Sequence, residues 1–496
     1  MSGLLNQNMG FPILSLIIFL PLIGVGILLF VKEVRLQKWI ALVFTLLDFL
    51  CAIVLILNFD RTTHEMQFRE THAWVPSLNI NYALGVDGIS LLFIFLTALV
   101  GWICVVASWN VIEKRVKEFM ISLLVMQSLM LGVFCALDLF LFYIFWEAML
   151  IPMYLIIGVW GGSDRVYAAF KFFLYTLAGS VLFLIGIIIL YFEGGRTFDI
   201  LILMDQNYPF AIQFWVFLAF FVAFAVKVPM FPFHTWLPDA HVQAPTAGSI
   251  ILAGVLLKMG AYGFLRFSLP MLPQASQYFA LPMLILSVVA IIYGGYLALA
   301  QDNLKKLVAY SSISHMGFVT LGLFVFNTQG LEGGILQMFN HGIITSALFL
   351  LVGLIDERAH TKQISDYGGL MKVAPVYTTF FAIFVLSSMA LPGTNGFIGE
   401  LLVLVGAFGS NKVIAALAIL GAALSAAYLL SMFKRVALGE PRSEHLEKIW
   451  DVDARELTAI LALVVFVFWV GLYPSPFLNI LHVSVEHLLH QLQPLP

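Results

Sequence analysis

Runs of about twenty apolar residues recur along the whole chain, and this feature constrains the fold more than any other. A helix needs about 20 mostly apolar residues to cross a lipid bilayer. Of the 496 residues, 61% are hydrophobic and 11% are charged, whereas soluble domains carry about 25% charged residues. The sequence therefore predicts an all-α polytopic membrane protein without a sizeable soluble domain.

The apolar runs predict fourteen transmembrane helices, at residues 11–31, 37–58, 84–107, 118–135, 137–158, 167–192, 211–240, 245–268, 278–300, 306–326, 333–355, 376–409, 413–437 and 456–480. The seventh and the twelfth are too long for one crossing. The seventh contains VPMFPFH, with Pro229 and Pro232, and the twelfth contains LPGTNG, with Pro392 and Gly393. Because proline lacks the backbone donor of a helix and clashes with the preceding turn, both helices are predicted to be broken.

The basic residues of the loops predict the orientation. Eighteen Lys and Arg residues lie in loops that follow odd-numbered helices, and five lie in the other loops. Positive residues favour the cytoplasmic side, so both termini are predicted to face the opposite side. The N-terminal stretch lacks the basic region and small-residue cleavage site of a signal peptide, which indicates an uncleaved first helix.

The helix order predicts an internal symmetry. Helices 4–8 and 9–13 form two sets of five, and the broken helix is the fourth member of each set. An odd number of helices inverts the second set, which is the inverted-repeat plan of secondary transporters. We therefore expect four parts: three N-terminal helices, a first repeat, an inverted second repeat, and a C-terminal helix with a tail, at residues 1–117, 118–269, 270–438 and 439–496.

Four ionisable residues lie near the middle of predicted spans: Glu147, Lys227, Lys258 and Glu400. A charge at the centre of a membrane helix costs about 2.5–3.5 kcal/mol on insertion scales, and such residues often mark ion pathways. A lysine beside a movable carboxylate can load and release a proton. We therefore interpret them as a proton-transfer line. The alternative is structural, with Glu147 and Lys227 forming one ion pair and the other two satisfied in a similar way.

Histidines provide candidate relays between these charges. His234, His315 and His341 lie in predicted spans, and histidine both accepts and donates a proton near neutral pH. His234 follows Lys227 by seven residues, so we expect it to face the same cavity. The alternative is that each histidine is an ordinary hydrogen-bond partner. His241 is expected near the membrane surface with Asp239.

Two further segments carry weaker expectations. Lys305 and Lys306 begin the tenth span and could line a cytoplasmic entrance, although anchoring at the membrane interface is the favoured interpretation. Residues 59–83 are the longest polar segment on the side opposite the cytoplasm. We expect them to form a small hairpin that contacts a partner.

The sequence lacks the motifs of cofactor chemistry. Its three cysteines, Cys51, Cys104 and Cys135, lie singly in apolar stretches, without the spacing of a disulfide framework or an iron–sulfur site. There is also no phosphate-binding loop and no dinucleotide fingerprint in a strand–turn–helix context. We therefore expect no cofactor in this chain, and any redox or ATP chemistry must belong to another chain.

Four motifs resemble a known family. FAVKVPMFPFHTWLPDAHVQAPTAGS, LDLFLFYIFWEAMLIPMYLIIGVWGG, KKLVAYSSISHMGF and LPGTNGFIGEL are similar to the M-subunit family of bacterial proton-pumping NADH:quinone oxidoreductase, respiratory complex I. The resemblance covers essentially the whole chain, and Glu400 favours the M subunit because sibling subunits commonly have lysine there. It implies that Glu147 pairs with Lys227, that Lys258 is a bridging lysine and Glu400 a terminal acid, and that His234, His315 and His341 lie between them.

The resemblance also implies a function and partners. The chain would be a proton-translocating subunit of the membrane arm of a translocase, in the inner membrane of a bacterium. Other subunits, including sibling antiporter-like ones, would hold FMN, the iron–sulfur clusters and quinone. An Mrp-type cation/proton antiporter subunit remains the alternative, since that family shares the long helix 7–8 motif. A pure scaffold is a third possibility, although a scaffold gains nothing from buried charges.

Overall fold

The computed structural model describes residues 11–442, 446 and 449–492. Within that part, thirteen helices are long and apolar enough to cross a membrane, and two shorter apolar helices make up one further crossing. The prediction of an all-α membrane protein with about fourteen crossings is therefore confirmed. Residues 1–10 of the predicted N-terminal segment lie outside the described residues.

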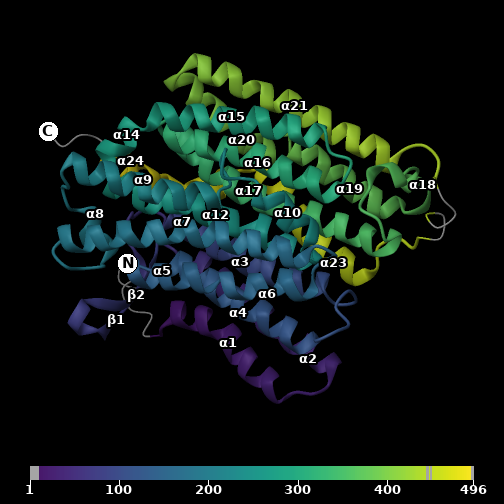
Figure 1. The fold of residues 1–496 in the computed structure, drawn as a ribbon, viewed down its shortest axis with the longest axis horizontal. Coiled ribbons are helices and arrows are strands. Elements are labelled where there is room, and N and C mark those ends of the chain that lie inside the picture. Colours follow the sequence, from purple (N-terminus) through teal and green to yellow (C-terminus); the bar gives the residue numbers. More distant parts are fainter. Residues whose placement is uncertain (1–10, 443–445, 447–448, 493–496) are drawn as a thin grey trace.

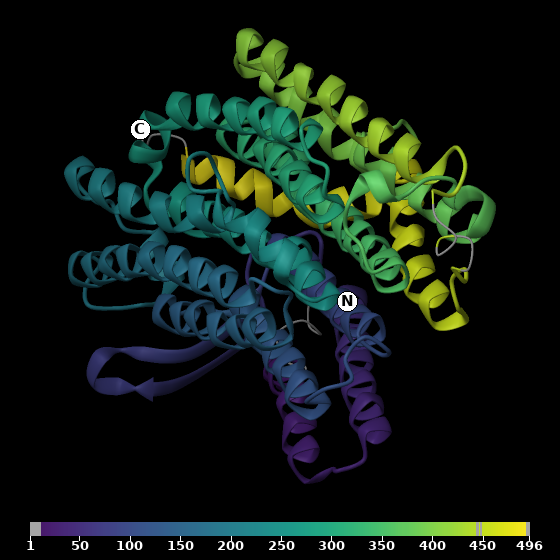
Figure 2. The same ribbon diagram turned by 45° about the vertical axis from the view of Figure 1, so that its right-hand side comes forward.

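The N-terminal part begins with a helical pair and a hairpin (Figures 1 and 2). Its elements are α1 (Ile13–Phe30), α2 (Val34–Asn58), the antiparallel strands β1 (Gln67–Val75) and β2 (Ile80–Val86), and α3 (Gly88–Ala107). Asn79, with φ of 53°, occupies the left-handed region at the turn between the strands. The hairpin expected within residues 59–83 is therefore present.

The next set of helices runs from residue 116 to residue 271. Its elements are α4 (Val116–Cys135), α5 (Leu139–Ala148), α6 (Leu150–Trp160), α7 (Arg165–Glu193), the short α8 (Ile200–Met204), α9 (Phe210–Lys227), α10 (Trp236–Gln243), α11 (Thr246–Ile251), α12 (Leu257–Gly263) and α13 (Leu269–Met271). Two π-helical segments, Leu252–Leu256 and Phe264–Ser268, join the last three helices into one continuous crossing.

The second set follows after α14 (Pro273–Tyr278). It consists of α15 (Ala280–Leu299), α16 (Leu304–Phe324), α17 (Thr328–Ala359), the short α18 (Leu370–Val373), α19 (Pro375–Ser388), α20 (Asn395–Ser410) and α21 (Lys412–Ala437). The two sets lie side by side in both ribbon views. They meet where α10 contacts α16 and where α11 contacts α17. This seam positions the candidate site.

Both predicted interruptions are present. The seventh crossing is broken between Lys227 and Trp236, and the twelfth between Ser388 and Asn395, where Gly393 has a φ of 89°. Polar side chains bind the backbone at both breaks: the Trp236 indole donates at 2.9 Å to Val226 O, a carbonyl near the end of α9, and the Asn340 amide donates at 2.8 Å to Asn395 O at the start of α20. Irregular backbone at membrane depth is tolerated where such partners exist.

The fifth crossing, expected at 137–158, is present as one span from Leu139 to Trp160. It is interrupted at Met149 between α5 and α6, because Pro152 cannot donate to the carbonyl four residues earlier. One predicted crossing differs from the structure. The last, expected at 456–480, is in fact two helices, α23 (Ala454–Leu472) and α24 (Ser475–Leu492). Pro474 separates them, and α24 buries one apolar stripe against the end of the bundle, next to α3 and α17.

Candidate functional site

Lys258 lies at the seam between the two sets of helices. It is completely buried, and it sits in α12 between the two π-helical segments. Its ammonium group donates to Ala253 O in the preceding π segment and lies 2.6 Å from His341 Nδ1 on α17. Segments of π-helix often occur at functional sites, and here one of them provides a backbone partner for the lysine.

The line of polar groups continues from His341 to Glu400. The rings of His341 and His315 have centroids 6.1 Å apart. His315 Nδ1, on α16, lies 2.8 Å from Glu400 Oε1 on α20, and the Gln337 amide donates to the same oxygen at 3.2 Å. All three of His341, His315 and Glu400 are at most 3% exposed. Four predicted residues, on four different helices, are thus brought into one buried line.

Lys227 and Glu147 are held differently. Lys227, at the end of α9, is 2% exposed, and its ammonium group lies 4.7 Å from the centroid of the Trp146 ring. Neither Lys227 Nζ nor Glu147 Oε2 has a hydrogen-bond partner among the described residues. The two charges interact electrostatically, but they do not form a direct ion pair within 4.0 Å. The purely structural pairing is therefore not what this structure contains.

His234 does not join Lys227 to Lys258. Its buried ring packs against Phe231 and Tyr293, with centroids 6.0 and 5.3 Å away, and its charged neighbour is Lys171. His234 Nδ1 has no hydrogen-bond partner among the described residues. The expectation that His234 faces the cavity of Lys227 is not supported, because the chain turns at the break before it reaches this residue.

His241 was expected in solvated surroundings near the membrane surface, but the protein buries it. Its ring is completely buried and stacks on Phe349 with centroids 4.3 Å apart. Lys258 and Lys305 are its charged neighbours, and neither ring nitrogen has a partner among the described side chains and backbone. Residues two apart in a helix point to nearly opposite sides, so Asp239 reaches Lys171 at 2.7 Å while His241 faces inward.

Lys305 is also more deeply buried than predicted. It is 3% exposed, donates to Ala244 O at 3.1 Å, and lies 3.7 Å from an Asp356 carboxylate oxygen. Interface anchoring is therefore the wrong interpretation for Lys305, whereas its neighbour Lys306 is partly exposed. The proximity of Lys305 to the inward-facing His241 places it on the approach to Lys258 from this end.

Sequence reasoning missed several further buried charged residues, among them Asp48, Asp87 and Arg266. Asp48, in α2, is completely buried and accepts from the Gln127 amide at 2.8 Å. Asp87 and Arg266 form a buried ion pair at 2.6 Å. Asp48 has the same signal as Glu147, an acid in the middle of an apolar run. Arg266 lies two residues before the predicted end of its span at residue 268, and its position there made it look like a loop cation, whereas the crossing continues to Met271.

Comparisons with known proteins show the family of this chain. The transmembrane family described as NADH:quinone oxidoreductase/Mrp antiporter matches residues 136–425. NADH-quinone oxidoreductase subunit M of Rhodobacter capsulatus is 49% identical, and the match covers 96% of this chain and 96% of that one. The chain belongs to the subunit M family of NADH-quinone oxidoreductase. The predicted family resemblance is thereby confirmed.

Solved structures place the subunit M family within its wider fold. A chain of respiratory complex I from Thermus thermophilus is 32% identical and superimposes with a TM-score of 0.90, covering 97% of this chain and 100% of that one. A chain of the Mrp complex from Dietzia is 21% identical, with a TM-score of 0.85 and coverage of 96% and 97%. The Dietzia structure shares the fold, whereas the closer sequence likeness is to complex I.

The described residues contain no group of three or more His, Cys, Asp or Glu side chains that could hold a metal ion. The polar line instead consists of two lysines, two glutamates and histidines from different helices. Such groups exchange protons with one another and with water. The side chains that line this part of the subunit M family member are therefore of the kinds that can accept and donate protons.

Proposed function

We propose that this chain translocates protons across the membrane as a membrane-arm subunit of NADH-quinone oxidoreductase, coupled to electron transfer in other subunits. The observation that carries the proposal is the buried line from Lys258 through His341 and His315 to Glu400. Ionisable residues buried at membrane depth are costly. Two hydrogen-bonded pairs of them, Lys258 with His341 and His315 with Glu400, meet at the seam, and proton movement accounts for this arrangement.

The second half of this line can pass a proton in defined steps. The Lys258 ammonium donates to His341 Nδ1, so a neutral His341 carries its proton on Nε2. Transfer from Lys258 to Nδ1 leaves a neutral amine and an imidazolium, which releases its Nε2 proton towards His315. A proton that arrives at His315 Nε2 allows the Nδ1 proton to pass to Glu400, 2.8 Å away. One water molecule bridging the histidine rings would complete the relay.

The first half of the line would act as the switch. The ammonium of Lys227 has only the Trp146 ring and the more distant Glu147 charge beside it. Movement of Glu147 towards or away from Lys227 therefore changes how strongly the lysine holds its proton. Loading from the cytoplasmic side, transfer to Lys258 and release through Glu400 would form one cycle. Water or side-chain movement must connect Lys227 to Lys258; His241 has Lys258 as a charged neighbour, whereas His234 has Lys171.

The surroundings of the chain belong to the same proposal. The distribution of basic residues favours an orientation with both termini on the positive side. The similarity to bacterial NADH-quinone oxidoreductase chains favours a bacterial inner membrane. Phe11, before α1, and Gln491, near the end of α24, line one cavity with the hairpin, as a shared side requires. Helices 4–8 and 9–13 would be inverted repeats. Sibling antiporter-like subunits would be neighbours, and partner subunits would hold FMN and the iron–sulfur clusters and supply the energy.

An Mrp-type cation/proton antiporter subunit is the alternative. The Dietzia Mrp chain has the same fold at 21% identity, but fold alone does not decide function. The higher identity to NADH-quinone oxidoreductase chains favours the respiratory assignment. A scaffold without proton transfer is disfavoured by the unpartnered Lys227, because a structural role would favour satisfied polar groups.

The test uses Lys258→Ala in the intact complex. NADH-driven quinone reduction and proton uptake into proteoliposomes are recorded together, and assembly is checked on a native gel. We expect both rates to fall by roughly tenfold or more, since the bridging group between the two halves is lost. Lys114→Ala, which removes an exposed surface cation, is the matched control and should retain both rates. Unchanged rates in an assembled Lys258→Ala complex would contradict the proposal.

A further inference from the structure

A second polar network lies on the same helix as Lys258. Positions 258, 262 and 266 are four residues apart, so the three side chains follow one face of the helix. The Arg266 guanidinium donates to Tyr262 Oη at 3.1 Å, to Ser90 Oγ at 2.9 Å and to Asp87 Oδ1 at 2.6 Å. Tyr262 Oη also lies 3.1 Å from Ser90 Oγ. The network therefore begins one turn away from Lys258.

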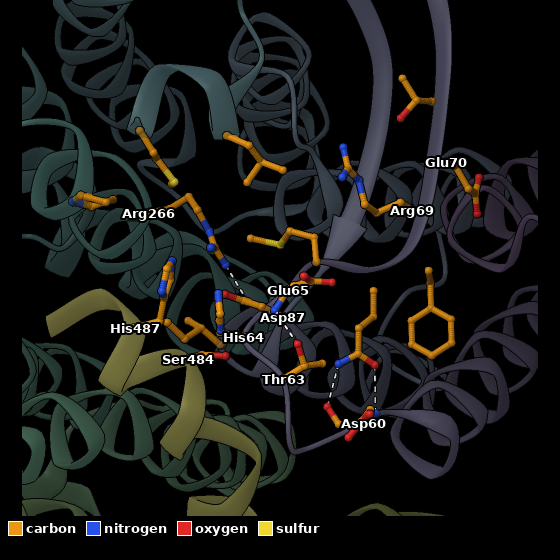
Figure 3. A pocket seen from close by; sticks show the side chains of 18 of the residues that line it. Asp60, Thr63, His64, Glu65, Arg69, Glu70, Asp87, Arg266, Ser484 and His487 are labelled. Carbon is orange, nitrogen blue, oxygen red and sulfur yellow. Dashed lines mark hydrogen bonds and ion pairs between the residues drawn. The ribbon is translucent and has the colours of Figure 1, made fainter. Parts of the chain in front are cut away.

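A cavity of about 1030 Å³ lies beyond this network (Figure 3). Asp87 and Arg266 form part of its lining and are only 4% and 7% exposed, whereas His64 and Glu65, from the segment before β1, are exposed. Ser484 and His487 of α24 line the same cavity. The Arg266–Asp87 pair thus stands between this cavity and the buried lysine.

The chemistry of the pair suits a barrier better than a relay. Arginine stays protonated in proteins and has five donors but no acceptor, so it cannot take up and pass on a proton. Eight helical residues separate Arg266 from Lys258, which corresponds to about 12 Å along the axis. A fixed positive charge in a pore raises the energy of an approaching proton or cation. Without that charge, the hydroxyls of Tyr262 and Ser90 would offer hydrogen-bonded steps towards Lys258.

We propose that the Arg266–Asp87 pair is an electrostatic seal that keeps protons of the outer compartment from reaching Lys258. The inference rests on the proposed function for the orientation of the chain and for Lys258 as a proton-carrying group. Asp87 has two tasks: its carboxylate caps α3 by accepting from Ser90 N at 2.9 Å, and it gives the buried guanidinium a hydrogen-bonded partner while Arg266 itself stays positively charged. By closing the path from the cavity to Lys258, the seal determines the direction in which protons leave Lys258.

The competing interpretation is purely structural, since Asp87, Ser90 and Arg266 also fasten α3 to the crossing that carries Lys258. Two single substitutions separate these interpretations. Asp87→Asn and Arg266→Gln both break the ion pair, but only Arg266→Gln removes the positive charge. A structural role predicts that both variants behave alike, whereas a barrier predicts a proton leak in Arg266→Gln alone.

The experiment measures passive proton leak in the absence of NADH. The intact complex is reconstituted into proteoliposomes, a pH gradient is imposed with the cavity side acidic, and its decay is followed with a trapped fluorescent pH indicator. We expect the leak through Arg266→Gln to exceed that of the unsubstituted complex and of Asp87→Asn by roughly tenfold. If Arg266→Gln assembles poorly on a native gel, the double variant Asp87→Asn/Arg266→Gln is measured instead. It lacks the charge but leaves no buried ion unpaired.

A third substitution identifies the route of the leak. Adding Lys258→Ala to the leaking variant should abolish the excess leak if protons reach the axis through this lysine. A gradient that the charge-free variant holds as well as the unsubstituted complex would overturn the seal, and a leak that persists with Lys258→Ala would overturn the route to the axis. These outcomes are independent of NADH-driven pumping. Failure of the seal is thus distinguishable from failure of the proposed function.

Discussion

The two buried lysines of the candidate site, Lys258 and Lys227, have contrasting surroundings. Lys258 donates to a backbone carbonyl and to His341, and the line continues with a hydrogen bond between His315 and Glu400. Lys227 is equally buried, but its ammonium group has only the face of Trp146 and no hydrogen-bond partner among the described residues. A polar group buried without a partner costs about 1–3 kcal/mol, and a charged group costs more.

This difference suggests a division of labour. The stretch from Lys258 to Glu400 contains two hydrogen-bonded pairs, at 2.6 and 2.8 Å, and is interrupted between the two histidine rings, where His341 Nε2 has no partner among the described residues. Once a water molecule bridges the rings, it can pass a proton with small movements. The stretch around Lys227 must rearrange to make any hydrogen bond. Strained or unsatisfied groups are retained where a change of state is part of the mechanism. We therefore expect rearrangement around Lys227 to control the rate of proton transfer, and the residues from Lys258 to Glu400 to pass the proton on without limiting that rate.

The sharpest way to break the connected stretch is His341→Gln. Glutamine still accepts from Lys258, but its amide does not take up a proton at neutral pH, so the relay ends there. We expect NADH-driven proton uptake in proteoliposomes to fall by about tenfold or more with the complex assembled. His72→Gln, which changes an exposed histidine of β1, is the control. Normal uptake in His341→Gln would show that protons bypass the connected stretch.

Glu400→Gln tests the end of the same stretch. It removes the carboxylate that His315 contacts at 2.8 Å while keeping the shape of the side chain. We expect uptake to fall by roughly three- to tenfold, because water at the end of the line can partly replace the acceptor. Glu400→Asp retains a carboxylate on a shorter side chain. Its proton uptake should lie between that of the unsubstituted complex and that of Glu400→Gln. An Asp variant slower than the Gln variant would mean that packing, and not proton acceptance, determines the loss.

Trp146→Leu tests the loosely held stretch. The indole face is the contact that the structure gives to the Lys227 ammonium, and a desolvated cation–π interaction contributes up to about 2 kcal/mol. We expect uptake to fall two- to tenfold, with Trp146→Phe in between because phenylalanine keeps a ring face. Equal losses in both variants would indicate that the volume of tryptophan matters and its interaction with the cation does not.

The smallest expected effect concerns how α24 is held against α17 and against the segment before β1. Glu332 of α17 accepts a hydrogen bond from His482 at 2.6 Å and raises the pKa of His482, so this contact is strongest below pH 6.5 and weakens as the pH rises through the raised pKa. Burial and then the neighbouring His64, whose ring stacks at 4.0 Å, lower the pKa of His487. The His487 contact therefore weakens as the pH falls through that lowered pKa.

Hydrogen–deuterium exchange of α24 at pH 6 and at pH 8, corrected for intrinsic exchange rates, measures the opposite pH dependences of the His482 and His487 contacts. We expect residues near His482 to be better protected at pH 6, and His482→Gln to remove that gain. The change should stay below about 1 kcal/mol, because His482 is exposed and its ion pair is screened by water. Protection that is unaffected by His482→Gln would show that the apolar stripe of α24 alone holds the helix in place.

Much of the fold was predictable because the local amino-acid composition of a segment determines whether it can form a membrane helix. The spans follow from apolar length, and Pro229, Pro232, Pro392 and Gly393 indicate both interruptions. Pro152 likewise accounts for the interruption at Met149 inside one crossing. Pro474 contains the same signal for the separation of α23 from α24, but the apolar run around it is short enough to pass as a single crossing, so apolar length alone gave the wrong prediction there.

The candidate site was predictable in its membership but not in its contacts. Charges such as Glu147, Lys227, Lys258 and Glu400 stand out in apolar runs without any knowledge of their neighbours. The depth of His241 did not stand out, because two residues separate it from the partly exposed Asp239. Which face of α10 points inward depends on the break before it and on packing against α16.

The sequence alone determined that this chain is a bundle of membrane helices with buried ionisable groups and two broken crossings, since each of these properties depends on residues close together in the chain. Only the tertiary structure decided that Lys258 meets His341, 83 residues away, that His315 meets Glu400, and that Asp87 meets Arg266. Such contacts depend on how helices rotate and pack against one another. Apolar surface fixes that packing without regard to which polar groups it brings together.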